Sequence, residues 1–314
     1  NINFNRGKVD KLADNVTGLY GTEWATSSTF PKSDYVLKEG RPVGLVRGLT
    51  ADGFYTTDDF TYANGVYTLK EGVADVSSAV FPNYHLHNGM NERPAGQLAY
   101  PGMAKFKDLN DDGIINDDDV DVIGDMTPVH TGGFNINATY KNFDLGLYFN
   151  WSYGNEIYNV NKLAALYGYK EGAVYENKLS IVKDCYKIYD VVNGELVALT
   201  TLEQLNAANA NAKLPLAYSE NGYVSTLGIE DGSYLRLNTL TLGYTLPKSI
   251  LQKAGISNLR VYGSIYNVFT ITGYSGIDAE VSTSTSTKTY PQLGMDWGTY
   301  PRARSFVLGV NLSF

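Results

Sequence analysis

The sequence predicts an all-β fold in which about six strands form one antiparallel sheet and carry long folded insertions. The chain contains 25 Tyr and 32 Gly but only 4 Met in 314 residues, a composition typical of strands and turns rather than helices. Apolar side chains alternate with small or polar ones over several segments, which is the period of a strand. The connections between these segments fall into two classes, short turns and long insertions.

The first predicted strand covers residues 2–9, and a hairpin follows much later in the chain. In this hairpin, apolar residues alternate with Asn and Thr over residues 134–140, and with small or polar residues over residues 143–152. Lys141 and Asn142 form the tight turn between its two strands. The hairpin therefore has one apolar and one polar face.

A fourth strand is predicted over residues 233–246, where Leu and Tyr alternate with Thr and Gly. Near Arg236 and Asn238 the apolar positions change phase, which indicates either a β-bulge or the point where the strand leaves an apolar layer. Pro247 ends the strand, and residues 248–255 favour a short helical connector. Residues 259–269 then form its partner strand.

The C-terminal residues 305–314 predict the sixth strand. Its even positions are all apolar, namely Phe306, Leu308, Val310, Leu312 and Phe314. The small or polar residues between them are Gly309, Asn311 and Ser313. Because successive strand residues point to opposite faces, the apolar set meets either the core of a soluble sandwich or the lipid around an outer-membrane barrel. The periodicity alone leaves both interpretations open.

Three insertions, residues 12–130, 153–230 and 270–303, separate the predicted strands by roughly 120, 80 and 35 residues, lengths uncommon for loops of a compact domain. Helix-forming runs in residues 161–189 and 201–213, and a short strand near VYTLKEGV, indicate that they are folded. Strand alternation places both short connections at one end of the sheet and all three insertions at the other. Short periplasmic turns and long extracellular loops are typical of outer-membrane barrels, so the lengths favour the membrane interpretation.

The composition and the motifs exclude several functions. A formal net charge of −8 and a pI of about 5.0 provide no basic surface for nucleic acid. The single Cys185 allows neither an internal disulfide nor a multi-cysteine metal site. There is no G-x-S-x-G motif and no carboxylate pair that marks a glycosidase site. We therefore expect no catalytic residues and no enzymatic activity.

Residues 108–119, DLNDDGIINDDD, have the spacing of an EF-hand calcium loop of the dockerin-like variant. The expected ligands, at positions 1, 3, 5, 7, 9 and 12, are Asp108, Asn110, Asp112, the Ile114 carbonyl, Asn116 and Asp119. Gly113 at position 6 permits the sharp turn that brings the oxygens together. We expect a structural rather than catalytic Ca²⁺, because protein oxygens fill every position. The alternative is a solvated acidic turn held by Asn and Asp hydrogen bonds.

Five segments together show a family resemblance. They are RPVGLVRGLTADGFYTTDDF, KFKDLNDDGIINDDDVDVIG, IGDMTPVHTGGFNINATYKNFDLGLYFNWSYGNEIYN, SYLRLNTLTLGYTLPKSILQKAGISNLRVYGSIYNVFTITGYSGIDAEV and GMDWGTYPRARSFVLGVNLSF. In order along nearly the whole chain, they resemble SusC/RagA-type TonB-dependent outer-membrane transporters of Bacteroidetes. The terminal Phe314 is also typical of outer-membrane barrels.

The resemblance implies a barrel of roughly 22 strands closed by an internal plug, located in the outer membrane and in contact with its lipid. Because nothing in residues 1–314 resembles the plug, the TonB-contacting segment or the first part of the barrel, it places this chain as the C-terminal part of such a transporter, with residues 108–119 in an extracellular insertion. It further implies TonB-dependent import of an oligomeric nutrient, most often an oligosaccharide, beneath a SusD-like lipoprotein. A dimer of transporter–lipoprotein pairs is also expected.

Three alternatives stay open at this point. They are an oligopeptide importer of the same family, a glycan-binding or adhesion β-protein that transports nothing, and an enzyme on a β-sandwich. Aromatic residues of the insertions offer stacking surfaces for cargo but equally fit loop packing or a membrane interface. These residues are Tyr153, Tyr158, Tyr167, Tyr169, Tyr290, Trp297 and Tyr300. No motif identifies the residues that contact the cargo.

Overall fold

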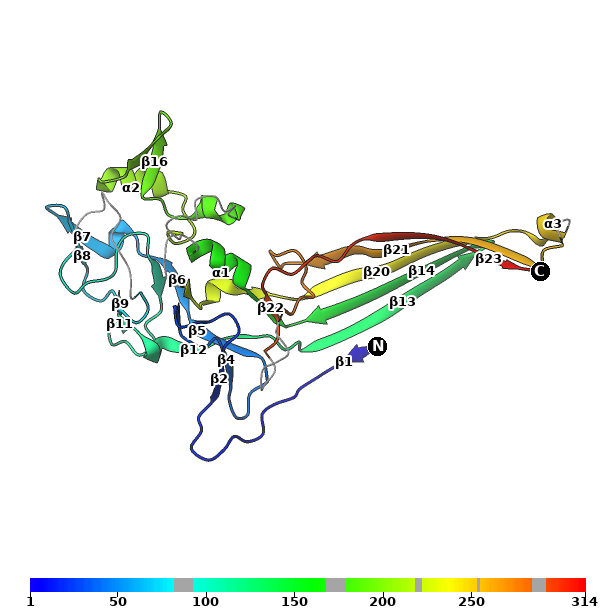
Figure 1. The fold of residues 1–314 in the computed structure, drawn as a ribbon, viewed down its shortest axis with the longest axis horizontal. Helices are drawn as coiled ribbons and strands as arrows, with labels where there is room; N and C mark the ends of the chain where they lie inside the picture. The colour runs from blue at the N-terminus through cyan, green and yellow to red at the C-terminus, as the bar shows by residue number, and fades with distance from the viewer. Residues whose placement is uncertain (82–92, 168–178, 218–221, 253–254, 284–291) are drawn as a thin grey trace.

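The structure is a computed structural model that describes residues 1–81, 93–167, 179–217, 222–252, 255–283 and 292–314. It is elongated, with a long twisted sheet at one end and the folded insertions at the other (Figure 1). Among the described residues, no helix combines the length and the apolar character needed to cross a membrane.

The main sheet has six strands in the order β1-β13-β14-β20-β21-β23, and every neighbouring pair is antiparallel. Their bounds are β1 Ile2–Asn3, β13 His130–Tyr140, β14 Phe143–Tyr153, β20 Tyr234–Thr245, β21 Asn258–Thr272 and β23 Ser305–Ser313. All six predicted strands are thus present. The prediction for residues 2–9 is wrong in length, because only two of these residues pair with β13 before the chain leaves the sheet.

The register places the apolar residues of five strands on one face. Phe134 of β13 pairs with Phe149 of β14, and Leu147 of β14 pairs with Leu240 of β20. Leu240 in turn pairs with Ile265 of β21, and Val261 of β21 pairs with Val310 of β23. A bulge interrupts the ladder at Asn238, where β14 pairs Tyr148 with Thr239 and then Phe149 with Leu237. The extra residue returns Leu235 and Leu237 to the same face as Leu240 and Leu242. Of the two explanations for the phase change, the β-bulge is therefore confirmed.

The apolar face, defined by the residues of this register, is open to its surroundings. Leu308 is 88% exposed, and Ile136, Leu242, Val261 and Val310 are also exposed. A soluble sandwich would cover such a face with a second layer, because burying its area is what stabilises the fold. No such layer lies on these side chains in the described part of the chain, which favours the lipid-facing interpretation.

Aromatic rings lie at both ends of this face, with aliphatic residues between them. Near the short turn, the ring centroids of Phe143 and Tyr244 are 4.7 Å apart. Nearer the insertions, the ring centroids of Phe134 and Phe149 are 4.6 Å apart. Phe143 and Trp151 are eight residues apart on β14, which corresponds to a strand length of about 26 Å. If the strand is tilted by about 40° from the axis of a barrel, this length spans about 20 Å along that axis. With the rings at each end, this approaches the apolar band of about 25 Å that is flanked by aromatic girdles in outer-membrane barrels.

The first insertion is built from short elements. They are β2 Leu19–Gly21, β3 Thr29–Phe30, β4 Tyr35–Leu37, β5 Leu45–Leu49, β6 Ala51–Phe54, η1 Thr57–Asp59, β7 Phe60–Ala63, β8 Val66–Leu69, β9 Asp75–Val76, β10 Ala104–Phe106, β11 Ile114–Ile115, η2 Asp117–Asp119 and β12 Val120–Asp125. The strand predicted near VYTLKEGV is β8, which pairs with β7. The sheet β12-β5-β4-β2 leads into β13 and so connects this insertion to the main sheet (Figure 1).

The other connections contain the remaining elements. They are β15 Glu156–Asn159, α1 Val160–Tyr167, η3 Ser180–Asp184, β16 Tyr189–Val192, β17 Glu195–Ala198, α2 Leu202–Asn209, β18 Gly222–Tyr223, η4 Thr226–Gly228, β19 Ile229–Asp231, α3 Lys248–Leu251 and β22 Met295–Asp296. Helix α1 overlaps the start of the predicted helical run 161–189, and α2 lies within the predicted run 201–213 and is shorter than it. The connector after Pro247 contains α3. A Thr201 capping box starts α2.

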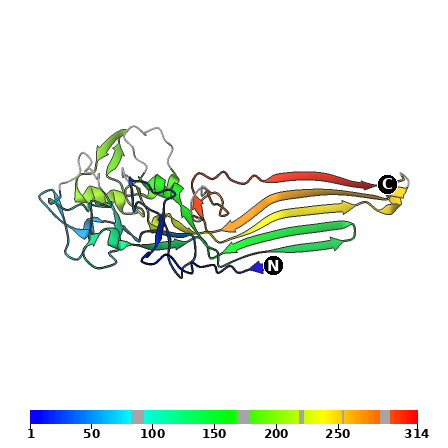
Figure 2. The ribbon, with the colours of Figure 1, turned by 60° about the horizontal axis from the view of Figure 1, so that its bottom comes forward.

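The first two insertions share one hydrophobic core. Tyr55 and Tyr67 of the first insertion lie in the same buried cluster as Leu163, Leu166 and Tyr223 of the second. Strand β18 pairs with β3, and Leu49 N donates to Val224 O at 2.9 Å. We call residues 12–126 and 156–228 together the loop unit. Figure 2 shows this unit beyond one end of the main sheet, with the 141–142 turn, α3 and the C-terminus at the other, as predicted from the connection lengths.

Candidate functional site

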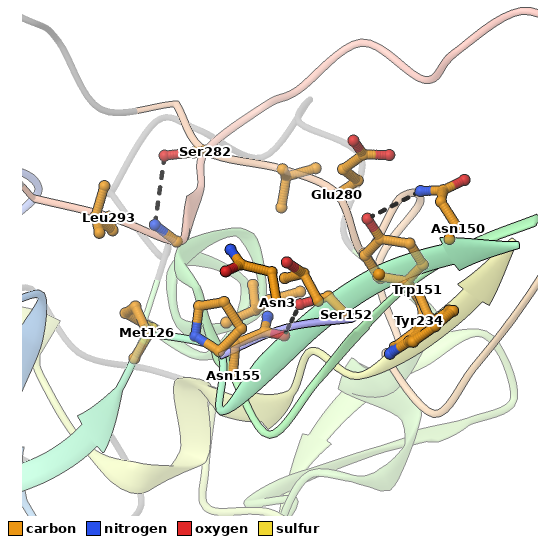
Figure 3. A pocket seen from close by; sticks show the side chains of 18 of the residues that line it. Asn3, Met126, Asn150, Trp151, Ser152, Asn155, Tyr234, Glu280, Ser282 and Leu293 are labelled. Atoms are coloured by element: carbon orange, nitrogen blue, oxygen red, sulfur yellow. Dashed lines mark hydrogen bonds between the residues drawn. The ribbon is translucent and has the colours of Figure 1, made fainter. Parts of the chain in front are cut away.

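A cavity of about 800 Å³, which we call the mouth cavity, lies where the polar face of the sheet meets the insertions. The side chains that matter for its chemistry are Asn3, Tyr148, Asn150, Ser152, Asn155, Tyr234, Glu280, Ser282 and Arg302. They come from the start of the chain, β14, the turn directly after it, β20 and the third insertion. Figure 3 labels most of them. Segments far apart in the sequence thus form one polar surface at the end of the sheet.

Most of the polar groups in the mouth cavity are uncharged. Asn150 Nδ2 donates to the Tyr234 hydroxyl at 3.4 Å, and Ser152 Oγ donates to Asn155 Oδ1 at 2.7 Å (Figure 3). Asn150 Oδ1 is buried and has no hydrogen-bond partner in the described part of the chain. Amides, hydroxyls and aromatic rings at a cavity wall can exchange hydrogen bonds with a polar ligand and stack on its flat surfaces.

A charged network borders the same cavity. Arg236, on the polar face of β20, is only 2% exposed and pairs with Asp278 and, at 3.4 Å, with Glu280. Arg302 completes the network with a 3.0 Å contact to Glu280 and a 3.8 Å contact to Asp278. Two cations and two anions balance within this network, which offsets the cost of removing Arg236 from water.

This network attaches the third insertion to the main sheet, because Asp278 and Glu280 follow β21, Arg302 precedes β23, and Arg236 lies on β20. The sequence analysis did not identify it. The available signals were a lone Arg within an otherwise uncharged strand, at the point where the apolar phase changes, and an Asp-x-Glu pattern after the next strand. Neither signal indicates which residues pair.

The six expected calcium-loop residues lie in one tight loop. Asp108 accepts from Asp112 N at 3.3 Å and Gly113 N at 2.7 Å. Asp112 Oδ1 accepts from Ile114 N at 2.9 Å, and Gly113 has the positive φ of +83° that its turn requires. Strand β11 then pairs with β9 and ties the loop to the loop unit.

The Asp119 carboxylate joins the two ends of the loop by hydrogen bonds. It is fully buried, accepting from Leu109 N at 2.7 Å and Asn116 N at 2.8 Å. Across the described residues, no group of three or more His, Cys, Asp or Glu side chains is close enough together to hold a metal ion. The observed bonds to backbone N–H groups are those of the acidic-turn alternative. The expected ligand set also includes two Asn side chains and a carbonyl, and whether it binds Ca²⁺ stays a prediction.

The aromatic candidates divide into exposed and buried residues. Tyr153, Trp297 and Tyr300 are exposed, and Tyr153 also stacks on His130 at 5.0 Å. Tyr158 is fully buried against Trp24 and Tyr35, so it is a core residue rather than a stacking surface for cargo. Two further candidates, Tyr169 and Tyr290, and the side chain of Tyr167 lie outside the described residues.

Curated proteins similar to the chain are TonB-dependent receptors, although no protein-family model matches it. TonB-dependent receptor P3 of Formosa agariphila is 30% identical over 319 residues, which cover 100% of the chain and 26% of that protein. TonB-dependent receptor SusC of Bacteroides thetaiotaomicron is 28% identical over 252 residues, covering 79% of the chain and 20% of SusC. The chain belongs to the SusC/RagA-type family of TonB-dependent receptors.

A solved structure of this SusC/RagA-type family has the same fold. The RagAB peptide importer in its closed-closed state superposes on the whole chain with a TM-score of 0.62 at 19% identity, over 26% of that chain. The chain thus spans about a quarter of the length of the proteins it matches. A six-stranded portion of a large antiparallel barrel with long folded loops is therefore confirmed as its fold class.

Proposed function

We propose that this SusC/RagA-type chain is part of a TonB-dependent importer that carries an oligomeric nutrient across the outer membrane. The observation that carries the proposal is the two-sided sheet, which exposes an apolar face bounded by aromatic rings and has a polar face on its other side. A wall of this kind separates lipid from a wet lumen. In this arrangement the loop unit lies on the extracellular side, and the 141–142 turn and α3 lie in the periplasm.

The proposed partners follow from the family. A SusD-like surface lipoprotein would dock over the loop unit, and TonB would act through the internal plug that the family resemblance implies. The names of the relatives support this proposal, since one is SusC itself and others are structures of the RagAB complex. We also propose that two transporter–lipoprotein pairs form a dimer. No catalytic step is assigned to any residue.

An oligosaccharide is the cargo that we propose. The mouth cavity supports it, since its uncharged amides and hydroxyls, together with Tyr148 and Tyr234, suit the hydroxyls and flat faces of sugar rings. Its charged residues Glu280 and Arg302 are paired with each other, so they are less available to a charged peptide backbone terminus. An oligopeptide is the second candidate, because the solved structures of similar fold are described as peptide importers.

Uptake by the whole transporter tests this proposal. The full-length protein and its lipoprotein, expressed in a transporter-deficient strain, should import labelled oligosaccharides and not oligopeptides of similar size. Asn150→Ala should reduce uptake, because it removes the buried acceptor at the cavity wall, whereas Asn137→Ala, on the same polar face but outside this cavity, should not. Uptake of peptides alone would favour the second candidate. Recovery of the protein in the soluble fraction without detergent would instead support the adhesion alternative.

We also propose that residues 108–119 bind a structural Ca²⁺ that holds the loop in one shape. The support is the ligand spacing, the positive φ of Gly113 and the placement of all six residues in one loop that β11 anchors. Extracellular modules work with dissociation constants of about 10⁻⁴ to 10⁻³ M. A site of this kind would therefore be filled at the roughly millimolar Ca²⁺ found outside cells.

A further inference from the structure

The loop unit has a second cavity, which we call the serine cavity, of about 460 Å³. Its volume lies within the range of about 300–1,000 Å³ that is typical of ligand pockets. Five of its lining residues carry hydroxyl groups, among them Ser27, Ser33 and Ser78. Its charged lining residues are Lys32, Arg47 and Asp117. The cavity thus carries a net positive charge within a chain whose formal net charge is −8.

Arg47 is the central residue of this cavity. It is half-buried on β5, its Nη1 donates to Ser33 Oγ at 2.8 Å, and its guanidinium lies 4.8 Å from the ring of Tyr20. Within the described part of the chain, no carboxylate lies within ion-pair distance of Arg47, and its Nε and Nη2 make no hydrogen bond. Two donors of a planar fork are therefore available to a ligand.

The electrostatics of Arg47 favour an anion. Burial lowers the pKa of its guanidinium, and the nearby Tyr20 and Asp117 only partly oppose this effect. An arginine nevertheless stays charged in proteins, so the chain bears the cost of partly removing a cation from water without a direct counter-ion. A carboxylate or sulfate group would supply that counter-ion and accept both free N–H groups of the fork.

We propose that the serine cavity binds the acidic group of a negatively charged saccharide, a carboxylate or a sulfate ester. Arg47 holds the group through Nε and Nη2, Lys32 adds charge at the rim, and the serine hydroxyls bond to the neighbouring sugar hydroxyls. The proposal rests on the proposed function in taking the ligand from an oligosaccharide cargo. It differs from the mouth cavity in its place, on the loop unit, and in its chemistry, which selects charge.

The test is binding to the intact transporter in detergent, measured by calorimetry with trigalacturonate, a sulfated trisaccharide and uncharged maltotriose. Both acidic probes should bind more tightly than maltotriose. Arg47→Gln should weaken the acidic probes by about 10- to 100-fold, the effect of losing a charged hydrogen bond, and should leave maltotriose unchanged. Lys32→Gln should have a smaller effect of the same kind. Arg41→Gln removes the same charge from an exposed position outside the cavity and is the matched control.

Each outcome decides the proposal. If neither acidic probe binds better than maltotriose, or if Arg47→Gln lowers the melting temperature without changing affinity, Arg47 only stabilises the loop unit. Binding of triglutamate as tight as that of the acidic sugars would replace the saccharide with an acidic peptide. If only one acidic probe binds more tightly than maltotriose, the proposal holds and the group that Arg47 binds is the carboxylate or the sulfate ester of that probe. Failure to take up any oligosaccharide, neutral or acidic, measured separately, would overturn the proposed function and leave this binding result intact.

Discussion

Arg260 on β21 reaches across β20 to Asp144 on β14, and the two side chains form a bidentate ion pair on the polar face. Arg260 Nε donates to Asp144 Oδ1 at 2.9 Å, and Nη2 donates to Oδ2 at 2.5 Å. The pair passes directly over Gly243, where a Cβ atom would collide with both side chains. Gly243 thus leaves the space that this contact between its neighbours occupies, and its own backbone conformation does not call for a glycine.

Gly243→Ala should consequently displace the ends of these two side chains and destabilise the folded barrel by about 1 kcal/mol or less, the usual value of a partly exposed ion pair. The measurement is the unfolding midpoint of the intact transporter in denaturant. Gly146→Ala is the matched control, because it lies on the same polar face and an added Cβ there meets only Asn137 Oδ1 at 3.4 Å. Equal effects of the two substitutions would show that the ion pair does not occupy this position.

Val310→Arg should cost about 2–4 kcal/mol, the penalty for an arginine near the midplane on the lipid-facing side of a barrel strand. Asn311→Arg, one residue later, should cost much less, because its side chain lies on the polar face. The fraction of heat-resistant folded barrel on gels measures both. A larger loss for Asn311→Arg than for Val310→Arg would reverse the assignment of the two faces.

The strands of the main sheet could be predicted because each alternates along its own length, and the register then only has to align the apolar faces. The bulge at Asn238 was visible for the same reason, since it changes a local phase. The length predicted for strand 2–9 is too great, because only Ile2 and Asn3 form hydrogen-bonded pairs with β13. The periodicity of a sequence does not show where an edge strand stops pairing with its neighbour.

The candidate site was less accessible to sequence reasoning. Arg236 forms an ion pair with Asp278, and Arg302 forms one with Glu280. The partners are far apart in the sequence, and the alternation of polar and apolar residues along a strand does not indicate which of them pair. The serine cavity is formed by four separate segments of the loop unit and has no motif. A calcium loop could be proposed from the sequence because all its expected ligands lie within twelve consecutive residues at a fixed spacing, and the binding of Ca²⁺ stays a prediction.

The proposed topology predicts which cysteine variants a membrane-impermeant thiol reagent can label on intact cells. Glu203→Cys, on the exposed surface of α2, should react, whereas Ser249→Cys in α3 should react only after the outer membrane is permeabilised. The native Cys185 is buried and gives little background. Labelling of Ser249→Cys without permeabilisation would contradict the proposed orientation.

The calcium proposal predicts that Asp108→Ala and Asp112→Ala weaken Ca²⁺ binding and loosen residues 108–119 while the barrel still assembles. Occupancy at ten times the dissociation constant adds about 1.4 kcal/mol, enough to order a loop but little against the stability of a barrel. Protease sensitivity of this loop, with and without chelator, measures the effect. Asp111→Asn is the control, because it removes a charge at position 4, which is not a ligand position, and Asn tolerates the φ of +58° found there. An equal response of the control, or none to chelator, would reject the ion.

Glu230 provides a pH-dependent link between the second and third insertions. Its carboxylate accepts from Ser275 N at 2.9 Å, from Ser275 Oγ at 2.8 Å and from Lys162 Nζ at 3.1 Å. Burial raises the pKa of Glu230, but the Ser275 hydrogen bonds and the Lys162 charge outweigh burial and lower it below its usual value of 4.5. Because the folded pKa is the lower one, the stabilisation is fully present above about pH 4.5 and is lost as the pH falls through the folded pKa.

Glu230→Gln should therefore loosen residues 273–283 at pH 7, by about 1–2 kcal/mol for charged hydrogen bonds at a partly exposed site, and should remove most of the pH dependence of this segment. Hydrogen exchange of the segment at pH 7 and near pH 4, corrected for intrinsic exchange, measures both effects. Glu195→Gln, on the exposed β16–β17 hairpin, removes the same charge and should change neither. Protection of the segment that stays constant between the two pH values in the native protein would show that the Glu230 carboxylate does not hold the third insertion in place.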